Sequence, residues 1–146
     1  EYFNIFVKSI FIDNMIFAND RPEVLAVLDW ELSTLGDPLA DFAYVSMAWV
    51  TENGGRSGVM DIDRAALGIP ELDEVVDRYC QKTGRDGLPD LNWYLAFNFF
   101  RLAAIMQGIK KRVIDGTANS AHAQDMSDKV QPLAQKAMEF ARKAGA

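Results

Sequence analysis

The apolar positions in the first third of the chain form short, dense runs that are typical of strands. Residues 2–17 are rich in aromatic and branched side chains, which favours a strand, although a short buried helix fits the same composition. A cluster of turn-forming residues at 18–22 separates them from an uninterrupted apolar run at 24–28, typical of a strand buried on both faces. Residues 15–17 and 24–28 therefore predict a β-hairpin.

From residue 36 onward the apolar positions change to helical spacing. The sequence Gly36-Asp37-Pro38 predicts a helix with Asp37 as its N-cap and Pro38 at its first position, continuing to residue 50. The polar, glycine-rich residues 51–58 predict a loop. A second helix is expected over 71–83, with Gly84 as its C-cap. Its apolar face follows helical spacing and consists of Leu72, Val75, Val76, Tyr79 and Cys80.

The last two predicted helices contain the most apolar part of the chain. Residues 90–114 predict the longest helix, since 13 of the 16 residues from 91 to 106 are apolar. Arg101 in its middle, with basic residues at 110–112, indicates a central buried helix rather than a membrane span. A final helix is expected over 121–143, with Pro132 kinking it or dividing it in two. Together these elements predict a mainly α fold with a small β-hairpin.

The amino-acid composition limits which partners and metal ions this chain can bind. The chain has 146 residues, of which 49% are hydrophobic, enough for one domain with a core and too many for intrinsic disorder. A net charge of −6 argues against nucleic acid or an anionic membrane as partner. Cys80 and His122 are the only residues of their types, so any metal site must use oxygen ligands, which favours Mg²⁺. No signal-peptide pattern is present, and we expect the cytoplasm as the compartment.

The charges are divided unevenly between the two halves of the chain. Residues 1–73 carry 4 basic and 13 acidic side chains, whereas residues 74–146 carry 11 basic and 8 acidic ones. Solvated helix faces are one interpretation of this division. The alternative is that acidic groups in the first half hold a cation.

Asn14 and Asp29 are the candidate ligands for such a cation. They lie 15 residues apart, at the two open ends of the predicted hairpin. A hairpin brings its open ends together, so the amide oxygen of Asn14 and the carboxylate of Asp29 can face one point. This pair suits a Mg²⁺ ion whose other ligands are water and phosphate oxygens.

Three blocks of sequence carry a resemblance to a known family. They are Ile-Asp-Asn-Met-Ile-Phe at 12–17, Val-Leu-Ala-Val-Leu-Asp-Trp-Glu at 24–31 and Gly-Asp-Pro-Leu-Ala-Asp-Phe-Ala-Tyr at 36–44. They closely resemble the phosphotransferase family of aminoglycoside and choline kinase-like enzymes, in the branch associated with acyl-CoA dehydrogenases. The resemblance implies the helical C-terminal lobe of a protein-kinase-like fold. It implies a single domain over 1–146, with an atypical segment 1–11, a metal-site hairpin 12–31 and a helical scaffold 37–146.

The resemblance also implies roles for individual residues. Asp29 matches the magnesium-binding aspartate that follows the buried strand, and Asn14 matches the asparagine that holds a second metal ion. Asp41 resembles the aspartate that braces the catalytic loop. The implied cofactors are ATP and Mg²⁺, and the implied acceptor is a hydroxyl group of a small molecule. For Arg101 an internal ion pair and a contact to the substrate both stay open.

The chain departs from the family at the catalytic loop. The family's catalytic Asp lies five residues before the metal-binding Asn, and counting back from Asn14 places Ser9 there, with Lys8 before it. A serine hydroxyl is not basic near neutral pH, so no catalytic base is intact. Residues 1–11 look unrelated to the family, the phosphate-covering Gly-x-Gly-x-x-Gly pattern is absent, and the start at Glu1 suits a fragment.

Two functions follow as hypotheses. The first is the C-terminal lobe of an ATP-dependent small-molecule O-phosphotransferase that is inactive as an isolated chain. The second is a degenerate, non-catalytic helical scaffold or interaction module. The expected partners are the missing N-terminal lobe or a second copy of the chain, with neither nucleic acid nor membrane involved.

Overall fold

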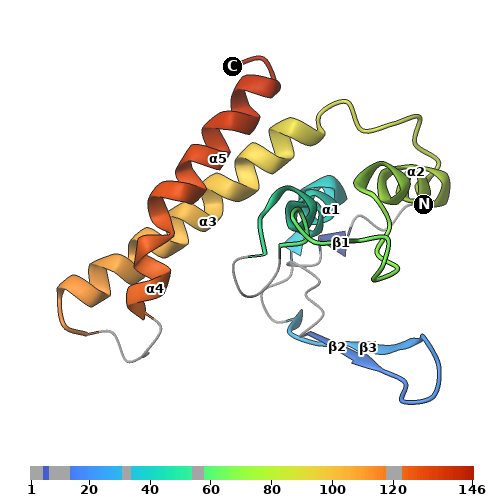
Figure 1. Cartoon of the computed structure of the whole chain (residues 1–146), viewed down its shortest axis with the longest axis horizontal. Helices are drawn as coiled ribbons and strands as arrows, with labels where there is room; N and C mark the ends of the chain where they lie inside the picture. Colours follow the sequence, from blue (N-terminus) through green and yellow to red (C-terminus); the bar gives the residue numbers. More distant parts are fainter. Residues whose placement is uncertain (1–4, 7–13, 31–33, 54–57, 118–122) are drawn as a thin grey trace. The chain divides into compact units, whose positions relative to one another are not determined.

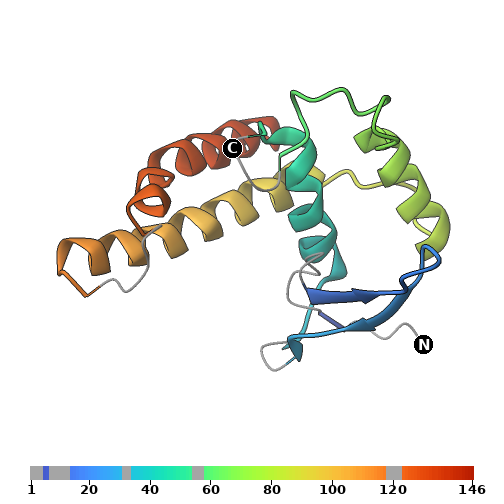
Figure 2. The ribbon, with the colours of Figure 1, turned by 60° about the horizontal axis from the view of Figure 1, so that its bottom comes forward.

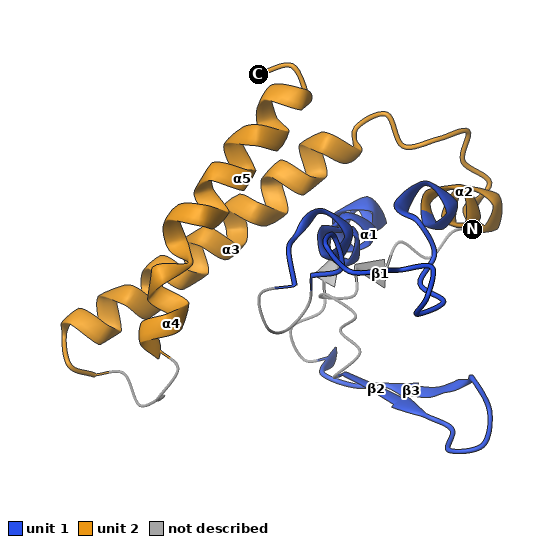
Figure 3. Cartoon of the chain, viewed as in Figure 1, with its two compact units in different colours: residues 1–75 blue, residues 76–146 orange. Residues whose placement is uncertain are grey.

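The computed structural model describes residues 5–6, 14–30, 34–53, 58–117 and 123–146. The chain divides into two compact units, residues 1–75 and 76–146 (Figure 3). Figure 1 labels the helices and strands along the chain. The single domain predicted over 1–146 stays a prediction.

Two short strands of the first unit form the predicted hairpin. Strand β2 (Met15–Phe17) pairs antiparallel with β3 (Val24–Val27), with Met15 opposite Val27 (Figure 2). The register shifts between Ile16 and Phe17, and the backbone N–H of Ala18 donates to the carbonyl of Glu23 at 2.9 Å to close the loop. The hairpin prediction is therefore confirmed.

The predicted burial of the second hairpin strand is wrong. Val24 is 46% exposed and Leu25 is 54% exposed, and the following Leu28 is also exposed. Each strand of a two-stranded ribbon has a single neighbour, and among the described elements of the first unit none packs extensively on this ribbon. An apolar run indicates a strand that can be buried, but neighbouring elements decide whether it is.

A second pair of strands precedes the first helix. Strand β1 (Ile5–Phe6) pairs antiparallel with β4 (Thr34–Leu35), so part of residues 2–17 is strand, as favoured from its composition. Helix α1 (Pro38–Ser46) begins where Asp37 caps it, because the Asp37 Oδ1 atom accepts from the backbone N–H of Leu39 at 2.9 Å. The chain then tightens into the 3₁₀ helix η3 (Met47–Val50).

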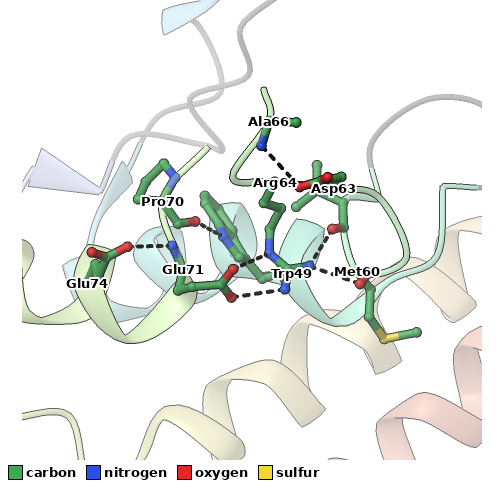
Figure 4. A network of polar contacts seen from close by, with 9 residues as sticks. Trp49, Met60, Asp63, Arg64, Ala66, Pro70, Glu71 and Glu74 are labelled. Atoms are coloured by element: carbon green, nitrogen blue, oxygen red, sulfur yellow. Dashed lines mark hydrogen bonds and ion pairs between the residues drawn. The ribbon is translucent and has the colours of Figure 1, made fainter. Parts of the chain in front are cut away.

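Arg64 holds together the loop that follows η3 (Figure 4). Its Nη1 atom donates to the carbonyls of Val59 at 2.7 Å and Met60 at 2.9 Å, and its Nε atom donates to Glu71 Oε1 at 2.9 Å. The indole of Trp49 donates to the carbonyl of Pro70 at 2.8 Å. The hydrogen bond to Glu71 raises the pKa of Arg64 above its ordinary value. These bonds connect both ends of the loop, whose described residues form neither helix nor strand.

Helix α2 (Leu72–Thr83) confirms the second predicted helix. Gly84 follows it with φ 69°, and the backbone N–H of Arg85 donates to the carbonyl of Cys80 at 3.0 Å. This is the Schellman arrangement, in which glycine adopts the left-handed conformation at low cost. Cys80 is buried, as expected from its place on the apolar face.

The second unit is built on helix α3 (Leu91–Ile114), the longest of the described helices. Helix α5 (Val130–Lys143) lies along it, and the short helix α4 (Ala123–Asp128) packs near its end (Figures 1 and 2). The rings of Phe99 and Phe140 stack between α3 and α5, with their centroids 5.7 Å apart. The buried side chains of this unit are Cys80, Leu95, Asn98, Phe99, Ala103, Ala123, Ser127, Ala137 and Phe140.

Helix α3, predicted to be a central buried helix, is buried on only part of its surface. Trp93 is 55% exposed and Phe100 is 65% exposed, although Leu95 and Phe99 on the same helix are buried. Overall apolarity cannot distinguish the two faces of a helix that is apolar on most sides. No helix in the described part of the chain is long and apolar enough to cross a membrane.

The last predicted helix is divided in two, at Lys129 rather than at Pro132. Pro132 lies in the first turn of α5, where its missing N–H would otherwise donate to the carbonyl of Asp128. That bond cannot form, and α4 ends at Asp128. The predicted effect of Pro132 is therefore confirmed, with the break one turn earlier because proline acts on the residue four positions before it.

Candidate functional site

Asn14 and Asp29 meet at the open end of the β2–β3 hairpin. The backbone N–H of Leu28 donates to the Asn14 carbonyl at 2.7 Å, which forms the last rung of the ladder. One residue further along, the Asn14 Nδ2 atom donates to Asp29 Oδ2 at 3.3 Å. The hairpin thus places both predicted ligands in contact, as their positions in the sequence indicate.

Asp29 has a backbone conformation that few residues adopt. Its φ angle is 63°, and among the described residues it has the only positive φ outside glycine. Aspartate and asparagine tolerate this left-handed region better than other side chains with a Cβ atom. Asp29 comes two residues after the end of β3, and its side chain is exposed. The turn therefore ends the strand and presents a carboxylate at its tip.

The pair has the chemistry of a site for a hard cation. The carboxylate of Asp29 offers two oxygen atoms, and a half-turn of the Asn14 amide exchanges its NH₂ group for its oxygen. Oxygen ligands of this kind suit Mg²⁺, which keeps several waters and phosphate oxygens in its shell. Among the described residues no group of three or more His, Cys, Asp or Glu side chains could hold a metal ion. Two protein ligands of this kind fit a cation whose remaining ligands are other oxygens.

The other acidic candidates lie on helix α1. Asp37 is the N-cap of this helix, and its carboxylate is used as the acceptor for the backbone N–H of Leu39. Asp41 lies in the first turn and is partly buried. The loop that Asp41 is expected to brace, with Ser9 and Lys8, lies outside the described residues, so this role stays a prediction.

The basic candidates lie on α3. Arg101 is partly buried in the second unit, and its role toward a substrate stays a prediction. Lys111 forms an ion pair with Asp115 one turn later, at the carboxyl end of the helix where a positive charge is favoured. His122 lies outside the described residues.

Sequence reasoning missed the hydrogen bond made by Trp30. Its indole Nε1 atom donates to the carbonyl of Val27, across the turn that contains Asp29. The sequence places an aromatic residue after the candidate ligand, but an indole that bonds to its own backbone leaves no periodic signal. The Arg64–Glu71 contact was also missed, because it joins two residues of an irregular loop.

A hairpin with two polar side chains in contact at its open end, followed by helices, is compatible with the kinase-like phosphotransferase lobe that the sequence resembles. A family model described as "Phosphotransferase enzyme family" matches residues 10–91. The chain therefore belongs to the phosphotransferase enzyme family. The predicted fold class, the helical lobe of a protein-kinase-like fold, is confirmed by a solved structure. This is a protein of Ralstonia eutropha JMP134, assigned as an aminoglycoside phosphotransferase, with a TM-score of 0.86 and 50% identity.

Curated relatives confirm the branch of the family. The chain is 46% identical to acyl-CoA dehydrogenase family member 10 of Mus musculus over 92% of its length, and 37% identical to family member 11 of Gallus gallus over 90%. It spans 13% and 18% of the length of these two relatives and 41% of the Ralstonia protein. Their names describe much longer proteins, of which the region matched here is one part.

Proposed function

We propose that this chain is the helical lobe of an ATP-dependent phosphotransferase that transfers a phosphoryl group to a hydroxyl group of a small molecule. The observation that carries the proposal is the contact between Asn14 and Asp29 at the open end of the hairpin. In a family of phosphotransferases, an amide and a carboxylate that meet at the open end of a hairpin are suited to hold Mg²⁺ against the phosphates of a nucleotide.

Each candidate site residue has a defined role in this proposal. Asp29 supplies the negative charge and Asn14 the neutral oxygen ligand, so together they hold the cation without neutralising it. When bound, ATP would supply the phosphoryl group, and Mg²⁺ would offset the charge that develops on that group during transfer. Asp41 supports the loop before Asn14, and Arg101 is the candidate for a contact to the acceptor. We propose the cytoplasm as the compartment.

Ser9 supports a second candidate function. A serine at the position of the family's catalytic aspartate removes the group that orients and accepts the proton of the acceptor hydroxyl. A chain that keeps Asn14 and Asp29 but lacks this base can bind a nucleotide complex without turning it over. We therefore propose that the chain as written is inactive, and that a non-catalytic scaffold is the alternative function.

A chimeric protein separates these two functions. The chain would be joined to the preceding part of the Ralstonia protein, and transfer of ³²P from ATP would be measured with kanamycin, choline or 3-hydroxybutyryl-CoA as acceptor. We expect only residual transfer for the parent chimera and, for Ser9→Asp, transfer to one acceptor at a rate roughly 10²–10⁴-fold higher. The double variant Ser9→Asp/Asp29→Asn should lose this gain. A Ser9→Asp chimera that folds but transfers no label to these acceptors would favour the scaffold.

A further inference from the structure

The indole of Trp30 bonds to the backbone of its own chain a few residues earlier. Its indole Nε1 atom donates to the carbonyl of Val27, three residues earlier, at 2.5 Å. The side chain is 47% exposed, so a hydrophobic core does not fix its position. The hydrogen bond ties the side chain of Trp30 to the end of strand β3.

This bond closes a turn around Asp29. Val27 and Trp30 are the residues that it joins, and Asp29, with φ 63°, lies between them. On the other side of the turn, the backbone N–H of Leu28 donates to the carbonyl of Asn14 at 2.7 Å. The left-handed residue is therefore flanked by the bond from Leu28 to the partner strand and by the bond from Trp30 to Val27. A left-handed aspartate persists only when its surroundings fix it.

We propose that Trp30 is a positioning residue for Asp29. Its indole N–H holds the turn in the conformation that places the Asp29 carboxylate 3.3 Å from the Asn14 amide. The inference rests on the proposed function in one respect, namely that Asp29 is a cation ligand. Phenylalanine keeps an aromatic ring but has no donor, and the proposal assigns the role to the N–H group and not to the aromatic ring.

Two replacements of Trp30 test the proposal. Trp30→Phe keeps an aromatic ring, and β-(3-benzothienyl)alanine at position 30 keeps the shape of the indole while replacing N–H by sulfur. Trp49→Phe is the matched control, because it removes an indole-to-carbonyl bond of the same kind, to Pro70, from the same unit. The whole chain is used, and circular dichroism checks that each variant folds.

The first readout does not depend on any cation. The ¹³Cα shift and the ³J(HN–Hα) coupling of Asp29 report its φ angle by NMR. We expect both replacements at position 30 to move Asp29 away from the left-handed values, and Trp49→Phe to leave them unchanged. Unchanged Asp29 values in a folded Trp30 variant would overturn the proposal.

The second readout is the affinity for Mn²⁺, measured from the free-ion signal in electron paramagnetic resonance. We expect both replacements at position 30 to weaken Mn²⁺ binding about 3- to 10-fold, with no change for Trp49→Phe. Asp29→Asn distinguishes the two proposals. If Asp29→Asn abolishes binding and the Trp30 variants bind like the parent, positioning fails and the cation site stands. If Asp29→Asn binds like the parent, the cation site of the proposed function fails, and the NMR readout alone decides the role of Trp30.

Discussion

Arg64 and Glu71 are joined by two parallel contacts, one from Nε to Oε1 and one from Nη2 to Oε2, each at 2.9 Å. The Arg64 side chain is 21% exposed, and the same guanidinium also binds the carbonyls of Val59 and Met60. A planar fork with several donors can make all of these bonds at once, which an ammonium group cannot. Arg64 is therefore the residue that organises the loop before α2.

Replacing Arg64 by lysine should loosen this loop. The Arg64→Lys variant keeps the charge but loses the bidentate contact, so we expect the midpoint of thermal unfolding to fall by a few degrees. Hydrogen exchange at residues 59–71 should accelerate. Arg78→Lys, at an exposed position of α2, is the control and should change neither quantity. Equal midpoints of thermal unfolding for the two variants would show that the bidentate contact from Arg64 to Glu71 does not contribute to stability.

Asp37 should act as a helix cap and not as a metal ligand. Asp37→Ala removes the acceptor for the Leu39 N–H and should lower the free energy of unfolding by about 1 kcal/mol. Asp37→Asn keeps an acceptor oxygen and should lower the free energy of unfolding by only a few tenths of the loss expected for Asp37→Ala. Urea unfolding of both variants measures the difference. An Asp37→Ala chain as stable as the parent would contradict the capping role, and a loss of Mn²⁺ binding in Asp37→Asn would show that Asp37 is a metal ligand.

Gly58 should not accept any side chain. A Cβ atom at this position would lie 2.0 Å from the backbone carbonyl oxygen of Glu52, closer than atoms can approach. We expect Gly58→Ala to destabilise the first unit by about 2 kcal/mol or more, in the range of overpacked positions. Gly68→Asn serves as the control, because that glycine has a positive φ and open space around its Cβ position. A Gly58→Ala chain as stable as the parent would disprove the close approach.

Glu139 on α5 should titrate below the ordinary range for glutamate. Its carboxylate accepts a hydrogen bond from Lys143 at 2.7 Å and lies 3.2 Å from Lys136, and these contacts lower its pKa. A carboxyl group whose pKa is lower in the folded state stabilises the fold above its unfolded pKa. This contribution is lost as the pH falls through the folded value. The effect should be small, because solvent screens an exposed pair.

An NMR titration of the Glu139 carboxyl carbon measures this pKa directly. Lys143→Met should move it upward, toward the ordinary glutamate value, because the first and largest cause of the shift is the hydrogen bond to Lys143. An unchanged titration in that variant would assign the shift to another group.

The sequence predicts the elements better than it predicts their burial. Spacing alone indicates the hairpin, α2 and α3, and the Asp37 cap and Gly84 C-cap follow from local backbone chemistry that nearby residues determine. Burial depends on distant neighbours, which is why Val24 and Phe100 are exposed although their surroundings in the sequence are apolar.

The part of the candidate site that depends on local strand pairing was also predictable from the sequence. Hairpin pairing places Asn14 beside Asp29, and that pairing can be read from two short runs and a turn. The indole bond from Trp30 to Val27 and the positive φ of Asp29 could not be predicted, because they depend on the geometry of one turn. Patterns of residue type do not contain that geometry.

We propose that Asn14 and Asp29 form a divalent-cation site. The most direct test is titration of the whole chain with Mn²⁺, observed by the paramagnetic broadening of assigned backbone resonances. Asp29→Asn keeps the left-handed turn and removes the charge, and Asp20→Asn, at an exposed acid in the loop of the same hairpin, is the matched control. We predict broadening centred on residues 14 and 28–30 that persists in Asp20→Asn, weakens at least 10-fold in Asp29→Asn, and is competed by Mg²⁺. Broadening that is spread over the acidic surface, or that survives Asp29→Asn unchanged, would contradict a cation site at Asn14 and Asp29.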